Sequence, residues 1–194
     1  MSETIKILGI AGSLREGSYN RAILRAAAEL APQGSDIEIF DIAGLPGFSQ
    51  DDEQDPPAKV ADLKQKIRGS DAVIFATPEY NYSVPGVLKN AIDWASRPYG
   101  DSAWDGKPAA IMGASVGNIG TARAQYHLRQ IMVFLNMHPL NRPEVMVGSC
   151  ADKFDANGNL TDQSTKDHIQ KQIVALVEWT KRLSAGKGKA AGEN

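Results

Sequence analysis

The sequence predicts an α/β fold in which helices cover both faces of a parallel sheet. Short apolar runs rich in Ile, Val and Ala alternate with longer segments of helical period, and this alternation is expected when the strands are buried on both faces. The chain has 194 residues, of which 42% are hydrophobic, and this size suits one domain with a substantial core. We therefore expect five strands and five helices in a single domain.

Five strand-sized apolar runs predict the sheet, at Ile5–Ala11, Ile37–Asp41, Ala72–Ala76, Ala109–Ala114 and Glu144–Val147. The segments that follow these runs have helical period, and they predict helices at Tyr19–Leu30, Pro57–Arg68, Val84–Arg97, Thr121–Asn136 and Thr161–Leu183. Local signals support several boundaries. The Gly69-Ser70 pair ends the second helix, and Pro139 follows the fourth. Ser83 and Pro85 fit the cap and first turn of the third helix.

The last expected helix carries an apolar stripe on one side, so it is predicted to cover the sheet as an amphipathic helix. The stripe consists of Ile169, Ile173, Leu176, Val177 and Thr180. After it, residues 184–194 have no apolar anchor and predict a disordered tail. This leaves residues 1–183 as the domain.

The charge balance and the cysteine count narrow the class of protein. Lys and Arg total 21 against 23 Asp and Glu, so no strong field gathers polyanions, and nucleic-acid binding is not favoured. Cys150 is alone, which excludes an internal disulfide, and it is expected to be a packing residue. The start MSETIKILGI lacks the pattern of a signal peptide, and no apolar run approaches the roughly 20 residues that span a bilayer. These features predict a cytoplasmic protein without a membrane span.

Ligands of an open parallel sheet bind beyond the carboxyl ends of the strands, where the strand order reverses. The loops after the first, third and fourth expected strands are therefore the candidates. The first, Gly12–Asn20, offers hydroxyls from Ser13 and Ser18, the amide of Asn20, the cation of Arg15 and free backbone N–H groups at a helix start. These groups suit a phosphate, because the N–H donors and the helix dipole favour an anion.

Three other interpretations of this loop remain open. A nucleoside triphosphate loop needs a lysine where Ser18 stands. A dinucleotide fingerprint needs a different spacing from that of Gly9, Gly12 and Gly17. A helix start capped by Ser18 without a ligand would leave Arg15 without a role.

The other two candidate loops suit a flat ring. The second, Thr77–Gly86, is stiffened by two prolines and presents Tyr80, Asn81 and Tyr82, although both tyrosines could also be packing or interface residues. In the third, Ser115–Arg123, N–H groups could face an electron-rich ring edge; the alternative is a plain turn with Thr121 as helix cap. We predict a binding site here because three unusual loops are expected at the same edge of the sheet. No metal site is expected, because the three histidines lie in different elements.

Three motifs together resemble the NADPH-dependent FMN reductase family of flavodoxin-like proteins. They are GSLREGSYN after the first strand, TPEYNYSVPGVLKNAIDW after the third, and a Ser-x-Gly turn that leads into TARAQYHLRQ. Within the family, the chain looks most like bacterial quinone and chromate reductases, and the resemblance covers Ile5–Leu183. It implies a three-layer sandwich with a five-stranded parallel sheet in the order 2-1-3-4-5, and an FMN-binding domain over residues 1–183.

The resemblance also implies which residues contact FMN. The phosphate would be held by Ser13, Leu14, Arg15, Glu16, Gly17, Ser18, Tyr19 and Asn20. The isoalloxazine would lie beside Pro78, Glu79, Tyr80, Asn81 and Tyr82, with the N–H near Asn81 beside N5, and its other side would contact Ser115 and Gly117. No side chain is needed as a nucleophile or acid, and Arg15 and Arg97 are candidate contacts for nucleotide phosphates or an anionic acceptor.

The activity that the resemblance implies is an FMN-dependent reductase that takes hydride from NADH or NADPH and passes electrons to quinones, chromate, ferric chelates or free flavin. Similar proteins form homodimers and homotetramers, and Arg123, Tyr126 and Glu144 match positions that join dimers. The alternatives are a flavodoxin-type electron carrier, although such carriers are usually strongly acidic with a threonine-rich phosphate loop, and a flavin-free regulatory module. No motif separates NADH from NADPH.

Overall fold

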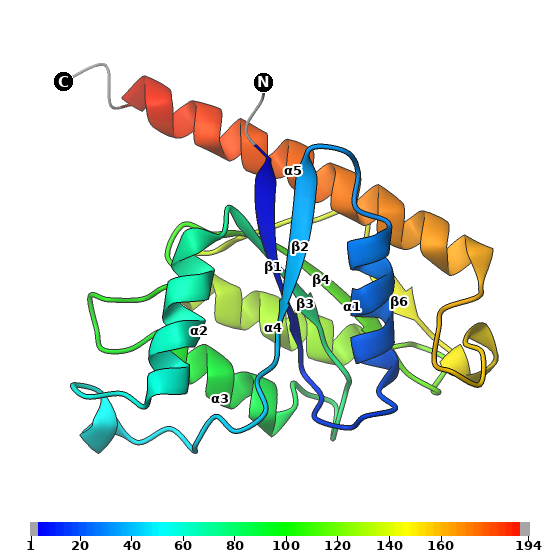
Figure 1. Cartoon of the computed structure of the whole chain (residues 1–194), viewed down its shortest axis with the longest axis horizontal. Helices are drawn as coiled ribbons and strands as arrows, with labels where there is room; N and C mark the ends of the chain where they lie inside the picture. Colours follow the sequence, from blue (N-terminus) through cyan, green and yellow to red (C-terminus); the bar gives the residue numbers. More distant parts are fainter. Residues whose placement is uncertain (1–3, 191–194) are drawn as a thin grey trace.

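The computed structural model describes residues 4–190 and shows an α/β flavodoxin-like fold (Figure 1). Its parallel sheet has the order β2-β1-β3-β4-β5, with β6 also paired to β4. The strands are β1 (Ile5–Ala11), β2 (Ser35–Phe40), β3 (Ala72–Ala76), β4 (Pro108–Ala114), β5 (His138–Pro139) and β6 (Val145–Val147). The α-helices of the described residues are α1 (Tyr19–Glu29), α2 (Ala58–Gly69), α3 (Gly86–Ala95), α4 (Ala122–Phe134) and α5 (Gln163–Ala190). The predicted fold class and strand order are confirmed.

The fifth position of the sheet is filled by two short strands where the sequence predicted one. β5 pairs with the start of β4 and β6 with its end. No pattern in the sequence predicts β5, because its two residues include Pro139, which lacks the N–H that a strand ladder uses. Pro139 follows α4, as expected, but it also ends β5, the first of the two short strands at this edge.

Each face of the sheet is covered by its own set of helices. α1 and α5 pack on one face, where Ile23, Leu24, Ile169 and Ile173 join the core. α2, α3 and α4 pack on the other face, in a second core cluster. Helices cover both faces, so the edge at the carboxyl ends of the strands remains open to a ligand. The loops after β1, β3 and β4 all lie at this edge (Figure 1). None of the described helices has the length and apolar composition that a bilayer span requires.

α5 is longer than the sequence predicted. Its expected apolar stripe is buried, and the hydroxyl of Thr180 donates to the carbonyl of Leu176 at 2.8 Å. The helix ends at Ala190, seven residues past the predicted end at Leu183. Residues 184–190 are therefore helical, where the sequence predicted the start of a disordered tail. Extending an existing helix costs little, because each added residue forms a bond without a new nucleus. Residues 191–194 of that tail lie outside the described residues.

The start of α5 gives a pH-dependent prediction. The Asp162 carboxylate accepts from the N–H and the hydroxyl of Thr165, at 2.8 and 2.6 Å, and these bonds lower the pKa of Asp162. A lowered pKa in the folded state stabilises the protein above the unfolded value of about 3.9, and this contribution disappears as the pH falls through the folded pKa. We expect Asp162→Asn to flatten the acid limb of the unfolding free energy in urea titrations. An unaltered acid limb in Asp162→Asn would contradict the assignment.

Candidate functional site

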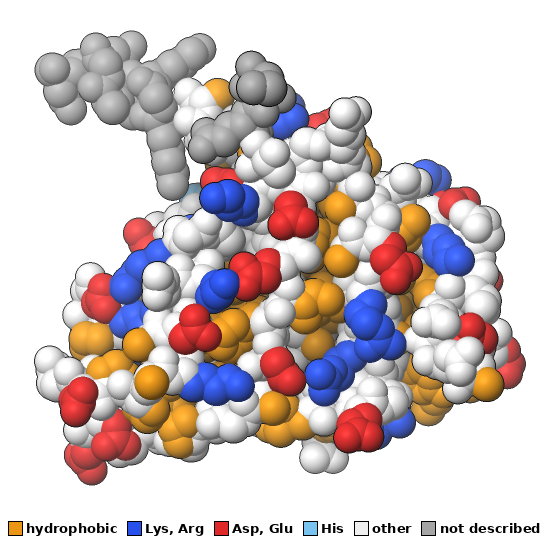
Figure 2. Space-filling view, viewed as in Figure 1, with side chains coloured by type: hydrophobic (Ala, Val, Ile, Leu, Met, Phe, Trp, Pro, Cys, Tyr) orange, Lys and Arg blue, Asp and Glu red, His pale blue; other side chains and the backbone are white. Residues whose placement is uncertain are grey.

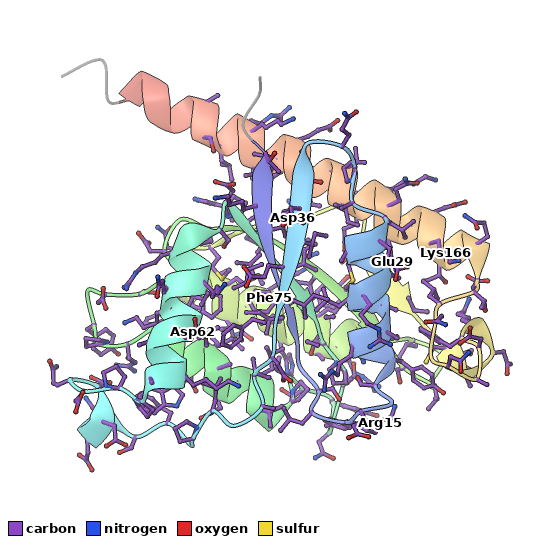
Figure 3. The ribbon with its side chains drawn as sticks, in the orientation of Figure 1. Arg15, Glu29, Asp36, Asp62, Phe75 and Lys166 are labelled. Atoms are coloured by element: carbon purple, nitrogen blue, oxygen red, sulfur yellow. The ribbon has the colours of Figure 1, made fainter. Side chains whose placement is uncertain are left out.

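A hollow of about 160 Å³ at the carboxyl edge brings the three predicted loops together. Its lining residues are Ser13, Arg15, Ser18, Tyr19, Asn20, Pro78, Glu79, Tyr80, Ala114, Ser115 and Val116. The other predicted FMN contacts lie exposed in the same loops, namely Leu14, Glu16, Gly17, Asn81, Tyr82 and Gly117. Figure 3 labels Arg15 at this edge, where the chain passes from β1 into α1. The structure therefore brings the three predicted segments together around one hollow.

The first loop keeps its hydrogen-bond donors available. Ser18 caps α1, because its Oγ accepts from the N–H of Arg21 at 3.3 Å, and the Oγ of Ser13 accepts from the N–H of Arg15 at 3.4 Å. Each serine thus acts as an acceptor within the loop and retains its O–H for another partner. The N–H groups of the first helical turn have no intrahelical acceptor. The loop therefore offers hydroxyl, backbone and guanidinium donors to an anion.

Asn20 lines the hollow and uses its side chain to join two of the loops. Its Nδ2 donates to the carbonyl of Ala114 and its Oδ1 accepts from the N–H of Ala114, both at 2.9 Å. The residue is only 3% exposed. The amide is thus used to tie the start of α1 to the end of β4, and the backbone N–H of Asn20 is what remains for a ligand. Asn20 holds the first and third loops at a fixed separation.

The third loop is fixed against the segment that follows β6. The N–H of Ser115 donates to Val147, and the carbonyl of Ser115 accepts from Cys150 at 3.1 Å. The Oγ of Ser115 accepts from the N–H of Gly117 at 3.1 Å, so that N–H is already engaged within the loop. Burial raises the pKa of the Cys150 thiol, and the residue belongs to the core. Cys150 therefore packs beneath the loop as a neutral thiol.

The second loop makes a tight turn in an uncommon backbone conformation. Tyr80 and Ser83 exchange backbone hydrogen bonds of 3.2 and 2.9 Å. Between them, Asn81 and Tyr82 have φ angles of 50° and 64°, a combination typical of a type I′ turn. A bulky residue at positive φ costs on the order of 1–3 kcal/mol and marks functional sites. The turn leaves 56% of Tyr80, which lines the hollow, and 66% of Tyr82 exposed.

Glu79 stabilises this turn through a contact that the sequence did not reveal. Its buried carboxylate accepts from Nε of Arg123 at 2.5 Å and from the N–H of Ala124, at the start of α4, at 3.1 Å. The Arg123 guanidinium lies 3.6 Å from the centre of the Tyr82 ring. The alternative interpretation of the third loop had Thr121 as the cap of this helix, but its side chain makes no cap bond, and Glu79 caps α4 from 45 residues away. The negative charge of Glu79 is therefore compensated and does not repel an anion in the hollow.

We expect Glu79→Ala to lower the free energy of unfolding by about 1–3 kcal/mol, because it leaves Arg123 and the start of α4 without their acceptor. The lower part of this range reflects the partial exposure of Arg123. Glu79→Gln retains an oxygen for the N–H of Ala124 and should recover part of the loss. Urea denaturation of both variants measures the difference, and equal losses would show that the cap bond contributes nothing.

Arg97 lies outside this hollow. It follows the C-terminal end of α3, stacks 4.0 Å from the centre of the Tyr99 ring and approaches Glu53 at 3.9 Å. Since α3 starts near the second loop and runs about 15 Å back along the sheet, the structure does not bring Arg97 to the site. Of the predicted intersubunit residues, Tyr126 is exposed, Arg123 contacts Glu79, and Glu144 lies 3.9 Å from Arg129.

A larger hollow elsewhere on the molecule and the placement of potential metal ligands do not indicate another functional site in the described residues. The larger hollow, of about 450 Å³, lies near the amino-terminal half of β1 and β2, lined in part by Asp36 and Asp62, which Figure 3 labels away from Arg15. Its lining includes side chains of both charges, and Lys66 and Glu38 form an ion pair at 2.5 Å. Within the described part of the chain, no group of three His, Cys, Asp or Glu side chains is placed to hold a metal ion.

The fold and the three loops define a flavodoxin-like protein with a hollow suited to a mononucleotide phosphate. Residues 5–152 match the model of the NADPH-dependent FMN reductase family. The chain belongs to this family.

The chain is also similar to named reductases over nearly its whole length. It is 57% identical to an NAD(P)H-dependent FMN reductase of Pseudomonas aeruginosa, with 94% of this chain and 99% of that protein covered. A 2-hydroxy-1,4-benzoquinone reductase of a Burkholderia species is 45% identical, with coverage of 91% and 97%. Among solved structures, FerB, a flavoenzyme NAD(P)H:(acceptor) oxidoreductase from Paracoccus denitrificans, has a TM-score of 0.85 and 38% identity, with coverage of 92% and 98%.

The residues present fit FMN. The donors of the first loop match a phosphate, the carboxylate of Glu79 is compensated, and exposed aromatic side chains stand beside the hollow. The volume of about 160 Å³ is below the several hundred Å³ of a typical ligand pocket. The hollow therefore suits the phosphate and its polyol chain, while a ring would extend outward along the tyrosine turn.

Proposed function

We propose that this protein uses FMN, held at the carboxyl edge of the sheet, to pass electrons from NAD(P)H to quinones. Bound FMN supplies the redox chemistry, by accepting hydride from the nicotinamide and giving electrons to the acceptor. The observation that carries the proposal is the convergence of the loops after β1, β3 and β4 on one hollow rich in donors. The names of its relatives support both the donor and the acceptor class.

The residues of the chain have separate tasks in this proposal. Ser13, Ser18 and Arg15 bind the phosphate together with the N–H groups at the start of α1. Tyr80, Asn81 and Tyr82 border the ring on one side, with Ser115 and Gly117 on the other. The hollow is too shallow to enclose a ring system, so a ring bound there would keep one face open. Donor and acceptor can therefore occupy the same exposed face in turn.

Several finer features belong to the same proposal. Chromate, ferric chelates and free flavin are further acceptors, since the open face selects little by shape. The protein forms homodimers, and homotetramers through Arg123, Tyr126 and Glu144; the exposed side chains of Tyr126, Val133 and Phe134 along α4 support an interface there. Residues 1–183 act as one FMN-binding domain in the cytoplasm.

A flavodoxin-type carrier is the alternative function. This chain differs from strongly acidic carriers in its net charge of -2 and in its GSLREGSYN loop. Anaerobic stopped-flow measurement separates the two. We expect NADH or NADPH to bleach the flavin absorbance of the FMN-loaded protein within the time of one turnover. Benzoquinone should then restore that absorbance. A protein that binds FMN but is not reduced by either nucleotide would support the carrier, and a protein that takes up no FMN would exclude both.

A further inference from the structure

A second hollow, of about 170 Å³, adjoins the candidate FMN site on the side of β2. It lies at the carboxyl ends of β1 and β2, and its lining residues are Ala11, Ser13, Arg21, Arg25, Ile39, Phe40 and Asp41. Ser13 lines both hollows, so they are neighbours along the same edge of the sheet. The proposed function uses the first hollow and leaves the second without a role.

The second hollow carries an excess of positive charge. Arg21 and Arg25 are four residues apart on α1 and therefore project from the same side of the helix. Arg21 contacts Asp41 at 3.3 Å, and Arg25 donates to the carbonyl of Gly158 at 3.3 Å. A guanidinium has five N–H donors, so these contacts use a small part of the available donors. Two arginines against one aspartate suit a phosphate dianion.

An apolar side chain completes the hollow. Ile39 lies on the edge strand β2 and is 42% exposed. Figure 2 shows this face of the molecule, where apolar side chains are exposed between α1 and α2 with charged side chains around them. An exposed isoleucine beside two guanidinium groups offers a surface for a purine ring next to a site for its phosphate.

The spacing of the strands relates the two hollows. In the order β2-β1-β3-β4, the loops after β3 and β4 are two to three strands from β2, which is roughly 10–14 Å. A dinucleotide whose nicotinamide lies at the ring can cross the Arg15 loop and place its adenosine end beside β2. Arginine near the end of the second strand accommodates the 2′-phosphate of NADP in other α/β folds, whereas an acidic residue there binds the ribose diol of NAD.

We infer that the Arg21–Arg25 hollow binds the 2′-phosphate of NADPH and sets the preference for NADPH over NADH. This inference rests on the proposed function and assigns the donor's adenosine end to a place in the chain. Because Arg21 engages Asp41, the carboxylate is withheld from a ribose diol, while both arginines line the hollow and keep further N–H donors for a phosphate. Removing Arg21 releases Asp41, which then repels the 2′-phosphate.

The kinetic test compares NADPH with NADH in Arg21→Ala, Arg25→Ala and the double variant. We expect the ratio of the KM values for NADPH and NADH to rise by about 10-fold to 100-fold in the double variant. Asp41→Asn should shift the ratio in the opposite direction. Arg182→Ala, on the exposed surface of α5, is the matched control and should leave it unchanged. An unchanged ratio in the double variant would overturn the inference.

A binding test does not depend on turnover. Calorimetry of the FMN-saturated protein with adenosine 2′,5′-bisphosphate and adenosine 5′-monophosphate should show tighter binding of the bisphosphate, by about 10-fold or more. The double variant should lose this difference. If the protein prefers the bisphosphate through these arginines but does not oxidise NAD(P)H, the proposed function is refuted and the assignment of the hollow to a 2′-phosphate stands. Equal binding of both nucleotides, or loss of FMN from the double variant, would refute the inference.

Discussion

Simultaneous replacement of Arg15 and Ser18 by alanine is expected to weaken FMN binding by about 100-fold or more. The change removes a guanidinium and a hydroxyl that line the hollow, and each charge-assisted hydrogen bond to a phosphate contributes about 1.5–3 kcal/mol. Two such bonds correspond to roughly two to four orders of magnitude in the dissociation constant. Quenching of flavin fluorescence on titration with apoprotein measures the effect directly.

Loss of the Ser18 cap could weaken α1 by itself, so a second variant separates folding from binding. Ser18→Asp preserves a good N-cap residue for the N–H of Arg21 but places a carboxylate beside the phosphate. It should fold with an unchanged melting temperature and still lose FMN. Arg182→Ala controls for the general loss of a positive charge. Retention of FMN by both Ser18→Asp and the double variant would move the phosphate away from this loop.

Much of this site was accessible from the sequence because its signals are local. A strand, a polar loop with small residues and a helix cap lie within a few residues of one another, and the rule that ligands gather at the carboxyl edge then joins three such loops. The fold class followed for the same reason, since alternating runs of different period are visible in any window of the chain. Ser18 is an example, because its side chain lies at the start of α1 and accepts from the N–H of Arg21 three residues later.

The parts that sequence reasoning missed depend on contacts between distant segments. Asn20 was assigned to the phosphate because an amide at a helix start is a plausible donor, yet its partner is Ala114, 94 residues away. Glu79 caps a helix that begins 43 positions later in the chain, a role that no local pattern separates from that of a ring contact. In both cases the side chain holds two loops of the site together. Such roles appear only when the fold brings the segments into contact.

Asn20 and Glu79 also explain how a shallow site keeps its shape. Asn20 fixes the third loop relative to the first, and Glu79 fixes the second relative to α4. The strained turn at Asn81 and Tyr82 is held by Arg123, which lies against the Tyr82 ring. Rigid support of this kind allows a ligand ring to be positioned at an open surface, where enclosure by the protein cannot orient it.

Gly113→Ala is expected to prevent folding or to cost several kcal/mol, out of a total stability of about 5–15 kcal/mol. Gly113 lies in β4, one residue before the strand ends, where the chain passes into the third loop. A Cβ at this position would lie 1.8 Å from Oγ1 of Thr121 and 2.5 Å from the carbonyl of Thr77. Both threonines are fully buried, so β3, β4 and the start of α4 would have to separate. Soluble yield and urea midpoints measure the loss.

Two further variants test the cause of this loss. Gly69→Ala, at the end of α2, introduces a Cβ that meets nothing within 4 Å, and it should be neutral or stabilising by up to about 1 kcal/mol, because alanine favours a helix. Adding Thr121→Ala to Gly113→Ala removes the hydroxyl and should recover only part of the stability, since the Thr77 carbonyl remains in the way. Full recovery would assign the entire effect to one side chain, and a stable Gly113→Ala protein would contradict the close packing of β4 against the start of α4.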